Sequence, residues 1–179
     1  LAELGVNVET PNKDGVTPVL IAAEYGHVEV VKVLAELGAN VETSDDENET
    51  PVFVAARYGH LDGVRLLAEL GANVEAPDID GTTPVYAAAG NGHAEVVRLL
   101  AELGANVETP SNAGAAPGRV AAQGGQAEAP RQMAEHGANV ETPKNDGGTP
   151  VYNAAGKGHA EVVRLLAELG ANVETPNNT

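Results

Sequence analysis

The sequence predicts an all-α repeat fold, a solenoid of stacked helix-turn-helix units joined by hairpin-like loops. The first observation is a strict 33-residue period, at which Gly-X-Asn-Val recurs from Gly5 to Gly170. The second is that Thr-Pro and Gly-His, both helix-boundary signals, recur at the same spacing in four of the five complete units. The third is the scarcity of aromatic residues. With one Phe, four Tyr and no Trp, the chain favours small, regular interfaces over one large globular core.

The repeat defines the domain organisation. We expect one domain over residues 1–179, with a partial N-terminal unit followed by five complete units of which the fourth is degenerate. The chain begins at Leu1 without a signal-peptide pattern, so we expect it to be a portion of a longer protein. The expected boundaries are 1–11, 12–44, 45–77, 78–110, 111–143 and 144–176.

The first half of each unit contains a turn and a short helix, as residues 78–110 illustrate. Asp78 to Gly81 have the composition of a tight turn. Thr83 followed by Pro84 predicts a helix start, with a hydroxyl N-cap and a proline where the missing N–H costs nothing. The helix is short and Ala-rich, and we expect Gly92 to end it.

The second half contains a longer amphipathic helix, expected from Ala94 to Leu103. Glu95, Arg98 and Glu102 are spaced to form ion pairs on the solvent face. Gly104 is expected to end the helix. The opposite face is broad and apolar, and comprises Val96, Val97, Leu99, Leu100 and Leu103.

These features resemble the ankyrin repeat family over essentially the whole chain. The residues that carry the likeness are Thr17-Pro18-Val19-Leu20, Ala22-Ala23 and Gly26-His27, repeated in register in the later units. The resemblance implies an L-shaped helix–helix–hairpin unit, a curved solenoid and a concave face that binds proteins. One departure is systematic, because the first His of the family pattern is replaced in every unit, by Leu20, Phe53, Tyr86, Arg119 and Tyr152.

Composition excludes several classes of function. The net charge of −16 disfavours nucleic acids and anionic membranes as partners, because binding to both depends on Lys and Arg. No apolar run approaches the roughly 18 residues that span a bilayer. The absence of Cys excludes disulfides, thiol catalysis and thiolate metal sites. We expect an intracellular, cytoplasmic protein.

The sequence predicts no enzyme, no catalytic residue, no metal site and no cofactor. Ser occurs only at Ser44 and Ser111, both in turns, and no triad or acid pair stands out from the repeat. Four histidines share one repeat position, too far apart to bind one zinc ion, and are interpreted as structural. The fifth, His136, replaces an expected core Leu. The four equivalent histidines are His27, His60, His93 and His159.

The densest acidic run is Ser44 to Glu49. It lacks the ligand spacing and central Gly of an EF-hand loop, and Asn48 stands where other units carry Gly. A solvated hairpin tip is the favoured interpretation, while a weak cation site and a partner contact remain open.

Positions that differ between units predict where a partner binds. The resemblance places the same positions on the concave face, and Tyr25, Tyr58 and Arg57 are residue types enriched at binding hot spots. Unconstrained drift is the competing explanation for each residue. Val16, Glu49 and Thr82 vary as well. The candidate binding residues are Lys13, Asp14, Glu24, Tyr25, Asp46, Glu47, Arg57, Tyr58, Ile79, Asp80, Asn91, Asn145, Asp146 and Lys157.

The leading hypothesis is therefore a non-catalytic scaffold that binds a protein or peptide with a basic or mixed surface. A second hypothesis is an architectural or self-associating segment that stacks end to end through uncapped terminal repeats, without a concave-face ligand. A third is an engineered binding scaffold, which the irregular unit 111–143 disfavours.

That fourth unit is predicted to be the least stable. Relative to the third unit it carries Gly118 for Val85, Gln132 for Leu99 and His136 for Leu103. Pro130 predicts a shortened second helix that begins near the proline, with 126–129 as loop. Drift in a copy supported by intact neighbours is favoured over a functional hinge or a groove completed by a partner.

Overall fold

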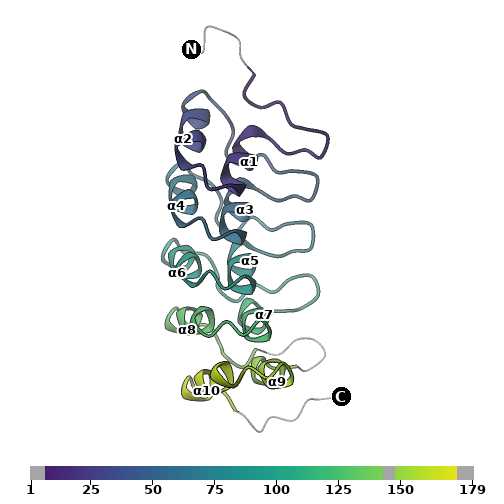
Figure 1. The fold of residues 1–179 in the computed structure, drawn as a ribbon, viewed down its shortest axis with the longest axis vertical. Coiled ribbons are helices and arrows are strands. Elements are labelled where there is room, and N and C mark those ends of the chain that lie inside the picture. The colour runs from purple at the N-terminus through teal and green to yellow at the C-terminus, as the bar shows by residue number, and fades with distance from the viewer. Residues whose placement is uncertain (1–6, 143–147, 173–179) are drawn as a thin grey trace.

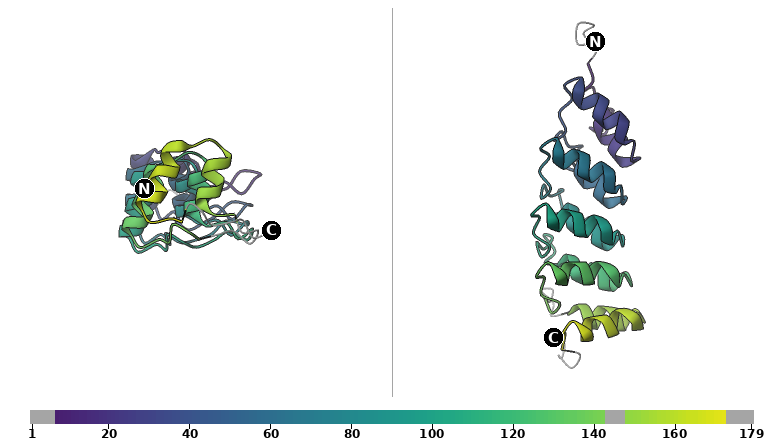
Figure 2. Two further views of the ribbon diagram at one scale, coloured as in Figure 1. Left: turned by 90° about the horizontal axis from the view of Figure 1, so that it is seen from below. Right: turned by 90° about the vertical axis from the view of Figure 1, so that its left-hand side faces the viewer.

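The computed structural model describes residues 7–142 and 148–172, and its helices form two parallel columns along an elongated stack (Figures 1 and 2). This part of the chain contains ten helices in five pairs and no strand, which confirms the all-α solenoid. The column beside the projecting loops consists of the first helices α1 (Pro18–Glu24), α3 (Pro51–Arg57), α5 (Pro84–Gly90), α7 (Pro117–Gln123) and α9 (Pro150–Gly156). The other column consists of the second helices α2 (Val28–Glu36), α4 (Leu61–Glu69), α6 (Ala94–Glu102), α8 (Glu128–Glu135) and α10 (Ala160–Glu168).

The first helices begin at Thr-Pro, as predicted. In α5 the Thr83 hydroxyl oxygen accepts a hydrogen bond from the backbone N–H of Tyr86 at 3.3 Å, and Pro84 occupies the first helical position. The same cap is present in α1, α3 and α9. Helix α7 lacks it, because Ala116 stands in place of Thr and has no hydroxyl.

The second helices of the regular units also begin and end close to the predicted positions. Helix α6 begins after the N-cap residue His93 and ends two residues before Gly104, whose φ of +91° is the left-handed conformation that glycine tolerates. On its solvent face Arg98 contacts Glu95 at 2.6 Å and Glu102 at 2.7 Å. Exposed pairs of this kind stabilise a helix only slightly.

One predicted core position is wrong. Val96, Val97, Leu99 and Leu100 are buried, but Leu103 is 43% exposed. Leu103 is the C-cap of α6, and the chain turns away at that point. His136, the equivalent residue of the fourth unit, is therefore exposed as well and does not replace a core Leu.

The core forms where the helices of each unit pack against each other and against the neighbouring unit. One continuous cluster of buried residues extends from Val19 in α1 to Met133 in α8. A separate, smaller cluster joins Ala122 of α7 to the last unit, where it includes Val151 and Leu166. The hydrophobic core is thus interrupted at the fourth unit, whose Ala121 belongs to the first cluster and whose Ala122 belongs to the second. Gly118, which replaces a buried Val, lines two cavities of about 20 Å³ there.

The degenerate helix α8 begins later than its equivalents, but less late than predicted. In α6 the N–H of Val97 donates to the carbonyl oxygen of His93 at 3.0 Å, whereas the equivalent Pro130 has no N–H. The helix therefore starts one residue later in the repeat, at Glu128, so Glu128 and Ala129 are helical rather than loop. Pro130 lies in the first turn, where a proline breaks no further helical bond.

The repeated histidines join neighbouring units. Nε2 of His60 donates to the carbonyl oxygen of Glu24 in the preceding unit at 2.8 Å. The ring lies so close to Gly26 that a Cβ atom there would be 2.5 Å from Nδ1 of His60. His93 has the same relation to Gly59. These contacts support the structural interpretation of the repeated histidines.

Candidate functional site

The structure places most of the candidate binding residues on the side of the loops and first helices. Glu24 and Arg57 are half-buried, while the other described candidates are exposed. Asn145 and Asp146 lie outside the described residues. The exposed candidates are Lys13, Asp14, Tyr25, Asp46, Glu47, Tyr58, Ile79, Asp80, Asn91 and Lys157.

The loop tips that carry the acidic candidates are held by side chains at their first position. The Asp78 carboxylate accepts backbone N–H bonds from Asp80 at 3.0 Å and from Thr82 at 2.8 Å. Asn12 and Asp45 form the same turn in the preceding units. Each loop therefore closes on its own, and its tip residues project from a fixed backbone.

Backbone hydrogen bonds also link neighbouring tips. Ile79 N–H donates to the carbonyl oxygen of Glu47 at 3.0 Å, and Asn112 N–H donates to that of Asp80 at 2.9 Å. Asn48 has a φ of +62° and takes the place of the glycine found in other tips, as its position in the repeat suggested. These links bring tip residues of successive units into one row.

Tyr25 and Tyr58 occupy the same position, the C-cap of α1 and of α3, in two neighbouring units. Their exposed fractions are 62% and 47%. The Tyr25 ring stacks on His27, with centroids 6.1 Å apart. Two large aromatic side chains are thus held at the surface rather than buried in the core.

Arg57 is engaged within its own unit rather than free for a partner. Both terminal nitrogens of its guanidinium contact the Glu49 carboxylate, and Nη2 lies 2.6 Å from Oε2. The guanidinium also lies over the rings of Phe53, at 5.6 Å, and Tyr58, at 5.1 Å. Arg57 therefore supports the position of Tyr58.

Glu49 is not a surface residue, although its variability between units suggested one. It is only 6% exposed. Burial raises the pKa of the Glu49 carboxyl above its ordinary value of 4.5, against the lowering effect of the hydrogen bond and the charge of Arg57. The pair is a local structural element of the second complete unit, because no other unit carries both residues.

A ladder of glutamates that joins the units was not predicted from the sequence. In the recurring Asn-Val-Glu, each Glu that the structure describes accepts a hydrogen bond from the backbone N–H of the Asn in the next unit. Glu42 bonds Asn73 at 2.6 Å and Glu75 bonds Asn106 at 2.8 Å. The Asn side chain in turn accepts the N–H two residues later. The invariance of this Glu in all six copies was the available signal.

The described residues lack the arrangements typical of metal sites and of membrane-spanning helices. Among the described residues, no group of three or more His, Cys, Asp or Glu side chains is placed to hold a metal ion. No helix in that part of the chain has the length and apolarity needed to cross a bilayer.

Comparison with known proteins agrees with the repeat geometry. The family model for ankyrin repeats, which spans three copies, matches four overlapping segments, residues 1–78, 43–111, 71–142 and 111–177. The search of curated proteins gave no significant match. Because the matches cover nearly the whole chain and the five helix pairs follow the same period, the chain belongs to the ankyrin repeat family.

Proposed function

We propose that the chain is a non-catalytic scaffold that binds a protein or peptide on the face formed by its loop tips and first helices. Ankyrin repeats generally mediate protein–protein interaction and are typically not enzymes. The observation that carries the proposal is the exposed pair Tyr25 and Tyr58 at equivalent positions of adjacent units. Exposed tyrosines on a rigid backbone provide contact area at low entropic cost.

The proposed partner has a basic or mixed surface. Asp14, Asp46, Glu47 and Asp80 are exposed at the tips of three consecutive loops. Together with the net charge of −16, they create a negative field that speeds association with basic surfaces and repels polyanions. The proposal accordingly includes neither nucleic acid nor membrane as a partner.

The test is to immobilise the chain, capture a partner from the native source, identify it by mass spectrometry and measure its affinity. Replacing both Tyr25 and Tyr58 with Ala is expected to weaken binding at least tenfold. Tyr152→Ala controls for the loss of an exposed tyrosine as such, because Tyr152 is 56% exposed but lies in the last unit, at a different repeat position from Tyr25 and Tyr58. Equal affinities for the wild-type chain and the double variant would place the site elsewhere.

A second candidate function is self-association without a ligand on the loop side. Exposed apolar side chains on α2 and its C-cap, namely Val30, Val33 and Leu37, form a surface that a second copy could cover. Sedimentation velocity over a hundredfold range of concentration tests this. A constant monomeric mass would exclude it, while a dimer that dissociates in the Val33→Lys variant would favour it.

A further inference from the structure

The fourth and fifth units separate on one side only. Helices α7 and α9 pack as closely as the other neighbouring first helices, and α6 packs closely on α8. In contrast, α8 and α10 do not pack closely. Because the units stay together on the first-helix side and part on the second-helix side, the array opens there as a wedge.

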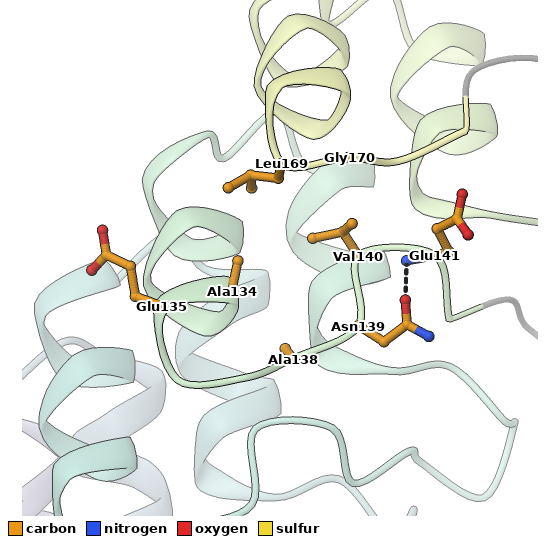
Figure 3. Close-up of a pocket in the computed structure, with 8 residues that line it drawn as sticks. All are labelled: Ala134, Glu135, Ala138, Asn139, Val140, Glu141, Leu169 and Gly170. Carbon is orange, nitrogen blue, oxygen red and sulfur yellow. Dashed lines mark hydrogen bonds between the residues drawn. The ribbon is translucent and has the colours of Figure 1, made fainter.

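The wedge forms a groove of about 470 Å³ (Figure 3). This volume falls within the range of about 300–1,000 Å³ typical of ligand pockets. Ala134, Ala138 and Val140 line it from the fourth unit and Leu169 lines it from the fifth. Figure 3 shows Leu169 and Val140 on opposite sides of the opening.

The two sides of the opening differ from the other units in opposite directions, because Leu169 is half-buried whereas the equivalent Leu70 and Leu103 are exposed. Ala138 is half-buried, whereas the equivalent Ala72 and Ala105 are buried. The nearby cavity that also contacts Val140 reaches Gly118, where the missing Val side chain leaves space. The residues that line the groove are the same as those at equivalent positions of other units, so the separation of the helices distinguishes this surface.

Two carboxylates flank this apolar floor. Figure 3 shows Glu135 and Glu141 at opposite ends of the groove. Oε1 of Glu141 also accepts the backbone N–H of Asn172, as part of the glutamate ladder. Within the part of the chain that the structure describes, Glu135 forms no ion pair, and of the equivalent glutamates only Glu102 does, with Arg98. A negatively charged rim around an apolar floor is complementary to a basic segment with an apolar side chain.

We propose that this groove is a second binding surface, which takes an extended segment of a partner protein with one apolar side chain between two basic residues. The apolar side chain lies between Val140 and Leu169, and the basic residues pair with Glu135 and Glu141. The surface is distinct from the loop tips, so it does not rest on the function proposed above.

The probe is a fluorescein-labelled nonapeptide with one Leu between two Lys pairs and Ala at the remaining positions. Fluorescence anisotropy measures its affinity, and ¹H–¹⁵N NMR of the full chain locates it. We expect the largest shifts at the amides of Ala134, Ala138, Val140 and Leu169. Peptides with Glu for Lys, or Ser for Leu, are expected to bind at least fivefold more weakly.

Matched variants distinguish binding of the peptide in the groove from its non-specific attraction to the acidic chain. Glu135→Lys and Leu169→Ser are each expected to weaken binding at least fivefold. The same changes at Glu69 and Leu70, equivalent positions on α4 and its C-cap, should change affinity less than twofold. Glu135 is exposed, so its replacement leaves the fold intact, and far-UV circular dichroism verifies this.

Three outcomes would overturn the proposal. One is a set of NMR shifts spread evenly over all five second helices, which would indicate non-specific charge attraction. Another is an equal effect of the variants and their controls. The third is a concentration-dependent shift of the groove amides without peptide, which would identify a second copy of the chain as the occupant.

Discussion

The carboxylate of Glu75 accepts the backbone N–H of Asn106 in the following unit, at an N···O distance of 2.8 Å. The two residues are 31 positions apart in the sequence, and equivalent bonds join the other units. A repeat protein gains its stability partly from such nearest-neighbour contacts. The ladder therefore couples each loop to the next.

Glu75→Ala should lower the free energy of unfolding by about 1 kcal/mol, because it removes a charged acceptor from a partly solvated backbone N–H. Glu75→Gln, which retains an acceptor oxygen, should cost less. Urea unfolding followed by circular dichroism measures both. Glu69→Ala, on the exposed face of α4, is the control, and a loss as large as that of Glu75→Ala would show that the ladder contributes nothing specific.

Burial of Glu49 predicts a specific pH dependence. Because burial raises the pKa of Glu49 above its ordinary value of 4.5, the folded state binds more protons than the unfolded state between those two pKa values. The stability contributed by this group should therefore fall as the pH rises through that interval. The measurement is urea unfolding at several pH values between about 4.5 and 7, for the wild type and Glu49→Gln.

The wild-type free energy of unfolding minus that of Glu49→Gln should decrease with rising pH. An increase would mean that the ion pair with Arg57 outweighs the cost of burial. An NMR titration of the Glu49 side-chain carboxyl gives an independent check, since its midpoint should lie above those of exposed glutamates.

Position 59 requires glycine for two reasons, the positive φ and the closeness of the His93 ring, and substitutions can measure the two costs separately. Gly59→Ala would place Cβ 2.5 Å from Nδ1 of His93, and the φ of +78° would strain any side chain. Gly71 has a φ of +91°, and a Cβ added there would meet nothing within 4 Å, so Gly71→Ala carries only the backbone cost, about 1–2 kcal/mol. Gly59→Ala should lose at least about 1 kcal/mol more in thermal unfolding. Equal losses would show that the ring moves aside freely.

The missing N-cap of α7 can be restored. Ala116→Thr should raise the free energy of unfolding by about 1 kcal/mol, because the hydroxyl can accept the backbone N–H of Arg119 as in the other units. Ala116→Val has nearly the same shape without the hydroxyl and is the control. If Val stabilises as much as Thr, filled space rather than capping accounts for the effect.

The fourth unit should open more readily than its neighbour. Gln132 is buried with its Oε1 unpaired, where the third unit has the buried Leu99. With the absent cap and the interrupted core, this predicts faster exchange of the amides of 118–136 than of 85–103. Native-state hydrogen exchange measures the difference, and equal protection would contradict it.

The features predicted correctly from the sequence depend on residues close together in the chain. The Thr83 cap, the Gly104 stop and the pairs made by Arg98 each involve residues within four positions, so residue type and spacing suffice. The exposure of Leu103 was not predictable in this way, because it depends on where the chain turns after α6.

The site was predicted less completely for the same reason. Variability identified Tyr25 and Tyr58 as surface residues, but it also suggested that Glu49 was exposed. Glu49 is buried because Arg57, eight residues later, folds back onto it. The groove beside Leu169 depends on how two whole units are tilted against each other, which no local pattern specifies.

The contact between His93 and Gly59 has a further consequence for how such a chain can lengthen. A unit that carries both the His and the Gly presents an imidazole to one neighbour and the space beside its Gly to the other. Such units can therefore replace one another in the stack, always in the same orientation. Duplication or deletion of 33 residues leaves complementary edges at the join, wherever in the unit the breakpoint falls. The array can therefore change its length by recombination while the same His–Gly contact forms between the newly joined units.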